Sequence, residues 1–188
     1  RTFYEHYRRD KQDLTARICS ISARLKRQAR VQDRRRVSAH APMKSISNET
    51  TFHEDTNDPD LLDGHLWRMC EKVSDRAKAK GLAGRVVTMK LKQSNFALVT
   101  KRTSLTAPTQ IADRIYRTAR SLFDQVGDKG PYRLLGAGIS DLSSADGADV
   151  TGDLLDPQGG QRAQAARATD ASRDKFGPDA ILKGRALR

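Results

Sequence analysis

Small polar and apolar residues alternate along residues 44–52, which marks this segment as a strand. Ile46 and Phe52 fall on one face and Ser45 and Ser47 on the other, as the two-residue period of a strand requires. Serines on a strand face cannot build a core, but their hydroxyls donate hydrogen bonds to phosphate oxygens without steric cost. The pattern predicts a strand with one buried face and one polar face that suits a polyanion.

Two later segments repeat apolar residues at the three- and four-residue spacing of amphipathic helices. The first follows Asp58 and Pro59, which suit an N-cap and a first helical position, and stops near Gly81. The second follows Thr109, the expected cap, and stops near Gly127. The apolar positions are Leu62, Leu66, Cys70, Val73 and Ala77 in the first helix, and Ile111, Ile115, Ala119, Leu122 and Val126 in the second.

Three further strands complete the pattern. Residues 85–92 alternate, residues 96–105 follow after a short turn, and residues 132–140 follow the second helix. Phe96 and Val99 both have the character of buried residues, which predicts a bulge between them. The order β-α-β-β-α-β predicts an α+β fold, a split four-stranded sheet with two helices on one face. The other face of the sheet is left open.

The net charge of the chain indicates what kind of partner this fold binds. The 188 residues include 35 Lys and Arg against 23 Asp and Glu, a net charge of +12. Such an excess indicates a polyanionic partner, with nucleic acid the leading candidate. A hydrophobic content of 37% supports one modest core. We therefore expect a basic arm and linker at 1–43, a core domain at 44–142, and a flexible tail at 143–188 with a marginal helix at 161–176.

The sequence carries no motif for a disulfide framework, a zinc site, secretion or a membrane span. Cys19 and Cys70 stand far apart with no spacing for a disulfide framework or a zinc site. We find no signal peptide and no run that is long and apolar enough to span a membrane. We expect a cytoplasmic monomer that has no membrane partner and holds no metal or cofactor.

Catalytic chemistry is not predicted for this chain. Its acidic residues gather around Pro59, which breaks the ligand spacing of a metal loop, so turn and cap roles are favoured. Two alternatives to DNA binding stay open. Gly159-Gly160-Gln161 matches the tripeptide with which peptide release factors hydrolyse peptidyl-tRNA. The second alternative is a noncatalytic RNA- or ribosome-binding module with a split sheet, although RNA-binding domains of that kind display aromatic residues on the sheet.

Four motifs occur in a fixed order: Lys44-Ser45-Ile46-Ser47-Asn48-Glu49-Thr50-Thr51-Phe52, Thr100-Lys101-Arg102-Thr103, Arg133-Leu134-Leu135-Gly136-Ala137-Gly138-Ile139 and Lys175-Phe176-Gly177-Pro178-Asp179-Ala180-Ile181. From about Arg27 to its end, the chain resembles the C-terminal part of bacterial Y-family translesion DNA polymerases of the polymerase IV group. That part is the little-finger domain and its tail.

The resemblance implies a domain that grips primer-template DNA during error-prone bypass of damage. The palm, which carries the catalytic acids and uses Mg²⁺, would precede it together with the fingers and thumb. Residues 1–26 do not resemble the thumb and stay unassigned. Because the chain begins at Arg1 rather than Met, we expect a fragment that is inactive alone.

The expected phosphate contacts lie on the open sheet face. They are Ser45, Ser47, Lys101, Arg102 and Thr103, with Lys90 and Lys92 as secondary contacts. Arg34, Arg35 and Arg36 would add nonspecific attraction. The resemblance also implies a second partner, the replication sliding clamp, for which Leu154 and Leu155 are the nearest apolar pair in the tail.

Overall fold

The computed structural model describes residues 15, 18–19, 21–23, 25–30, 42–126, 130–149, 158–177 and 179–184. The chain divides into two compact units, Arg1–Ala41 and Pro42–Arg188. In the first unit, the described residues up to 29 are helical, and Ile18, Ile21 and Leu25 expose their side chains. The second unit holds the sheet.

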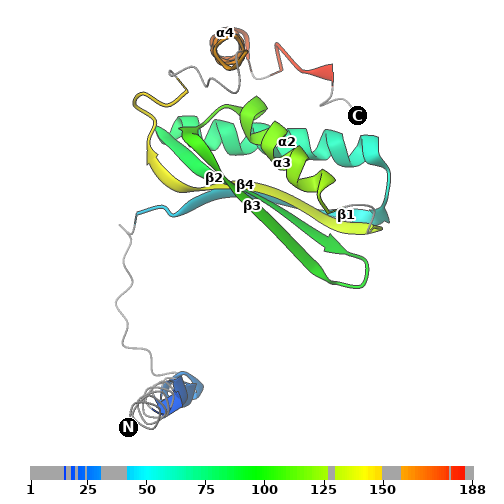
Figure 1. Cartoon of the computed structure of the whole chain (residues 1–188), viewed down its shortest axis with the longest axis vertical. Helices are drawn as coiled ribbons and strands as arrows, with labels where there is room; N and C mark the ends of the chain where they lie inside the picture. Colours follow the sequence, from blue (N-terminus) through cyan, green and yellow to red (C-terminus); the bar gives the residue numbers. More distant parts are fainter. Residues whose placement is uncertain are drawn as a thin grey trace, which may run out of the picture. The chain divides into compact units, whose positions relative to one another are not determined.

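Four strands of the second unit form one antiparallel sheet in the order β1-β4-β2-β3. Two helices cover one face of this sheet (Figure 1), and a third, α4, follows the last strand. The α+β fold with a split β-α-β-β-α-β order is therefore confirmed. The elements are β1 Ser45–Thr56, α2 Pro59–Ala79, β2 Leu82–Gln93, β3 Leu98–Thr109, α3 Ala112–Asp124, β4 Tyr132–Ser144 and α4 Gly159–Phe176.

Local signals fix the ends of α2. The Asp58 carboxylate accepts the amides of Asp60 and Leu61, at 2.9 and 3.3 Å, so this residue is the predicted N-cap. Gly81, just beyond the helix, has a φ of +60°, which a residue without a Cβ adopts at low cost. At α3 the prediction is wrong by two residues, because Thr109 ends β3 and the N-cap is Ile111.

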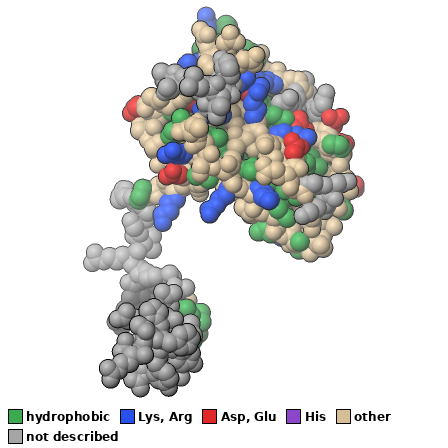
Figure 2. Space-filling view, in the orientation of Figure 1, with side chains coloured by type: hydrophobic (Ala, Val, Ile, Leu, Met, Phe, Trp, Pro, Cys, Tyr) green, Lys and Arg blue, Asp and Glu red, His purple; other side chains and the backbone are tan. Residues whose placement is uncertain are grey.

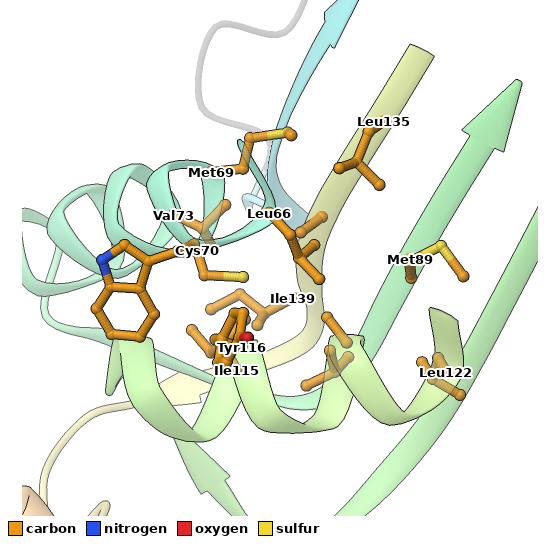
Figure 3. Packing of buried hydrophobic residues seen from close by; sticks show 14 of the residues in the cluster. Leu66, Met69, Cys70, Val73, Met89, Ile115, Tyr116, Leu122, Leu135 and Ile139 are labelled. Atoms are coloured by element: carbon orange, nitrogen blue, oxygen red, sulfur yellow. The ribbon is translucent and has the colours of Figure 1, made fainter. Parts of the chain in front are cut away.

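The core lies between the helix pair and the sheet. Every apolar position predicted for the two helices is buried. Trp67 is also buried, which the spacing did not predict, because α2 packs sideways against α3 and the Trp67 ring meets that of Tyr116 at 5.2 Å. Figure 3 shows Leu66, Met69, Cys70 and Val73 of α2 and Ile115, Tyr116 and Leu122 of α3 against Met89, Leu135 and Ile139 of the strands.

The β2–β3 hairpin differs from its prediction at the turn. Phe96 belongs to the turn rather than to a strand, with 60% of its surface exposed and a φ of +67°. Its amide donates to the Gln93 carbonyl, and the Gln93 amide donates to the Ala97 carbonyl. The shift in strand register lies at the far end of the hairpin, between Gly84 and Val86. The predicted burial of Phe96 and the bulge beside it are therefore wrong.

Ion pairs hold α4 against the other helices. Asp170 of α4 forms an ion pair of 2.7 Å with Lys78 of α2, and Arg173 of α4 forms one of 3.0 Å with Glu71 of α2. Past α4, the Lys183 ammonium lies 4.4 Å from the centre of the Trp67 ring. The Gly-Gly-Gln tripeptide forms the first turn of α4.

The apolar residues of α4 provide little buried surface. Ala163 is buried, whereas Phe176 is exposed. Polar contacts rather than a broad apolar stripe therefore fix this helix.

Candidate nucleic-acid interface

The sheet face turned away from α2 and α3, here called the open face, collects alternate residues of all four strands. Lys and Arg side chains project from the sheet side of the unit in the space-filling view (Figure 2). Cross-strand register arranges the face in four rows: Ser45, Ser140, Val86 and Ser104; Ser47, Gly138, Thr88 and Arg102; Glu49, Gly136, Lys90 and Thr100; Thr51, Leu134, Lys92 and Leu98.

Two glycines of β4 lie in the middle of the open face, where atoms of β1 pack closely against them. A Cβ at Gly138 would lie 2.6 Å from the Cβ of Ser47 and 3.0 Å from the carbonyl oxygen of Ile46. A Cβ at Gly136 would lie 2.9 Å from the Cβ of Glu49. Both glycines are buried, and the absence of a side chain at these positions lets β1 and β4 pack closely.

Most of the residues predicted to contact phosphate lie on the open face. Ser45, Ser47, Lys90, Lys92 and Arg102 all lie in its rows. They come from three strands, so no single segment of sequence forms the surface.

Lys101 and Thr103 do not share this face. They register with Met89 and Val87, which point into the core, so their side chains lie on the helix side of β3. Adjacent residues of a strand point to opposite faces, and only Arg102 of that trio faces outward with the serines. Both Lys101 and Thr103 are still exposed because β3 is an edge strand.

The cations of the open face have different surroundings. Lys90 forms an ion pair of 2.8 Å with Glu49, and the Lys92 ammonium lies 4.9 Å from the Phe96 ring centre. Within the described part of the chain, Arg102 has no ion pair. Sequence reasoning missed Glu49, although it shares the strand parity of Ser45 and Ser47.

The acidic residues near Pro59 serve structural roles. Asp58 caps α2, and Asp63 accepts the Tyr116 hydroxyl and lies 3.5 Å from Arg120. Among the described residues, no three His, Cys, Asp or Glu side chains gather closely enough to hold a metal ion.

Other predictions concern a membrane span, the clamp contact and the basic arm. None of the described helices has the length and apolar character to cross a membrane. Leu154, Leu155 and the arginines 34–36 lie outside the described residues.

Residues 43–154, which include the whole sheet, match the model of the impB/mucB/samB family C-terminal domain. The chain belongs to this family. It is 45% identical over 172 residues to DNA polymerase IV 1 of Mesorhizobium japonicum, covering 92% of this chain and 39% of that protein. DNA polymerase IV of Brucella melitensis is 45% identical over 165 residues, or 88% of this chain and 37% of that protein.

The resemblance drawn from the four motifs is thus confirmed. This impB/mucB/samB chain spans about two fifths of the length of these curated relatives. Among solved structures, it is similar to the little finger domain in a complex of that domain of PolIV with the beta-clamp processivity factor. The similarity has 25% identity and a TM-score of 0.44, and covers 51% of this chain and 86% of that one.

Proposed function

We propose that this domain grips the sugar-phosphate backbone of primer-template DNA for a translesion DNA polymerase of the impB/mucB/samB family. One observation carries the proposal: Ser45, Ser47, Lys90, Lys92 and Arg102 meet on a sheet face that neither α2 nor α3 covers. Hydroxyls and cations are the side chains that most often contact phosphate and sugar, and such contacts position a protein without reading sequence.

The composition of the open face favours backbone contact over base recognition. None of the side chains in its four rows is aromatic, whereas sheet-based RNA readers stack bases on aromatic residues. A grip that ignores sequence suits a polymerase, which must move over any template.

Phosphoryl transfer belongs to other parts of such a polymerase. Two-metal chemistry needs clustered ligands that hold both ions, and the described residues do not form such a cluster. We therefore assign no catalytic step to this domain and place the Mg²⁺ of the intact enzyme elsewhere. We expect the domain to act on DNA in the cytoplasm and as a monomer.

A protein partner follows from the family resemblance. We propose that Leu154 and Leu155 contact the replication sliding clamp, because two apolar anchors in a polar segment suit a preformed pocket. Replacing both leucines by alanine should abolish capture of the chain by an immobilised clamp and leave DNA affinity unchanged. If wild type and variant are captured equally, these leucines are not the contact.

DNA binding is tested by fluorescence anisotropy with a labelled primer-template duplex over a series of salt concentrations. Binding of the wild-type chain should weaken steeply with salt and not depend on base sequence, because each neutralised phosphate adds about 0.9 to the slope of log K against log salt. The double variant Lys92→Met/Arg102→Met should bind more weakly and lower that slope.

The matched control removes two positive charges, one from α2 and one from its C-cap residue, in Lys72→Met/Lys80→Met. Both residues are exposed and belong to the helix layer. The control should retain most of the affinity. Equal losses in the two double variants would show that net charge alone attracts DNA, and would contradict a specific role of the open face.

A further inference from the structure

The turn of the β2–β3 hairpin holds an aromatic residue where its backbone favours glycine. Phe96 has a φ of +67°, a conformation in which the Cβ of an L-residue crowds the following carbonyl oxygen. Hairpins with a left-handed residue after a tight turn usually place Gly or Asn there. Burial does not compensate for the strain, because 60% of the Phe96 surface is exposed. Strain that brings no packing gain points to a functional role.

Two cations gather around this exposed ring. The Lys92 ammonium and the Arg133 guanidinium each lie 4.9 Å from its centre. Leu98, which registers with Lys92 across the hairpin, is also exposed at 56%. Figure 2 shows hydrophobic side chains reaching the surface at this end of the unit. The hairpin tip thus combines an aromatic ring, an aliphatic side chain and two positive charges.

We propose that this tip binds an unpaired nucleotide of the template strand, with the base against Phe96 and Leu98 and the flanking phosphates on Lys92 and Arg133. The inference rests on the proposed function, because Lys92 and Leu98 also form the last row of the open face. A strand that leaves the duplex at that end of the sheet would reach the tip.

The chemistry of the tip favours a nucleotide over an apolar protein surface. Bases stack on aromatic side chains whatever their identity, and cations beside the ring neutralise the adjoining phosphates. Residues 92–98 contain no acidic side chain that would repel a phosphate. An apolar protein partner would cover Phe96 and Leu98 but leave Lys92 and Arg133 with no counter-charge.

Binding to three labelled DNAs tests the tip: a blunt duplex, the same duplex with a single-stranded 5′ overhang, and that overhang with abasic sites. The wild-type chain should bind the overhang duplex more tightly than the other two. Phe96→Gly should lose this preference, a drop of about fivefold or more for one stacked base, and keep its affinity for the blunt duplex. Phe96→Trp should retain the preference.

Thermal unfolding of the same variants separates function from folding. Phe96→Gly should melt at a higher temperature than the wild-type chain, since glycine adopts the turn without strain, so weaker binding cannot reflect a damaged fold. If the ratio of overhang to blunt affinity is the same in Phe96→Gly and wild type, the tip assignment is overturned. If the wild-type chain binds none of the three DNAs, the proposed function fails, and this inference fails with it.

Discussion

Lys90 and Glu49 form a 2.8 Å ion pair although their strands, β2 and β1, are not neighbours in the sheet. Both residues register with Gly136 on the intervening strand β4. Because Gly136 has no side chain, the Lys90 ammonium reaches the carboxylate across the strand. A face that we propose to bind phosphate therefore also carries an acid, which neutralises part of its charge.

Glu49→Gln should tighten DNA binding. The change removes a charge that repels phosphate and releases Lys90 to contact DNA, and exposed charge pairs contribute up to about 1 kcal/mol, so we expect an effect of about two- to fivefold. Asp124→Asn, at the end of α3, is the matched control and should have less effect. Anisotropy titration at one salt concentration measures both. Weaker binding of Glu49→Gln would instead mean that Glu49 holds Lys90 in its binding position.

Gly138→Ala should destabilise the domain by about 1–3 kcal/mol, as overpacked sites do. Its Cβ would lie 2.6 Å from the Cβ of Ser47 and 3.0 Å from the Ile46 carbonyl oxygen, so the backbone of β1 would have to move. Gly136→Ala should cost less, because its Cβ would lie 2.9 Å from the Cβ of Glu49 and 3.4 Å from the nearest backbone atom, the Asn48 carbonyl oxygen. Gly160→Ala, in α4 with nothing within 4 Å, should be neutral or stabilising. Denaturant unfolding ranks the three variants, and the reverse order for the two sheet glycines would contradict the packing account.

Reversing one charge should release α4 from α2. Asp170→Lys would place a second cation beside Lys78, so amide hydrogen exchange within α4 should rise. The chain has one tryptophan, and Trp67 lies beneath Lys183, so its emission should shift to the red as the tail leaves. The exchanged pair Lys78→Asp/Asp170→Lys should restore both signals. If the pair fails to restore protection, attraction between these two residues does not hold the helix.

The two thiols should react at very different rates. Cys19 is exposed, whereas Cys70 is buried and its burial raises the pKa of its thiol. Since the thiolate is the reactive form, a thiol reagent should modify one cysteine in the native chain and both in denaturant. Cys70→Ala should leave the native reaction unchanged, and a second fast thiol in the native wild type would contradict the burial of Cys70.

Local signals made much of the fold predictable. Asp58 and Pro59 mark the start of α2 because a cap and its first turn depend on adjacent residues. The buried stripes of both helices follow from spacing alone. The alternation of β1 placed Ser45 and Ser47 together on one face, which the structure confirms.

The errors arise where a side chain's position depends on distant partners. Phe96 is apolar, and nothing local shows that its backbone is left-handed and that its ring lies outside the core. Lys101 and Thr103 adjoin Arg102 in the sequence, which suggests one common surface, although the alternation of side chains along a strand places them on the opposite face from Arg102. Trp67 is buried by α3, which no periodicity within α2 can reveal.

The most direct test of the open face as a DNA-binding surface compares two adjacent residues of β3. Arg102 faces outward with Ser47, and Lys101 registers with the buried Met89 on the other side. Each is replaced by methionine, and the affinity for primer-template DNA is measured across a salt series. Arg102→Met should weaken binding and lower the salt slope by about 0.9, the loss of one phosphate contact, whereas Lys101→Met should change neither by a comparable amount. Equal effects, or a larger effect of Lys101→Met, would contradict the assignment of DNA binding to the open face.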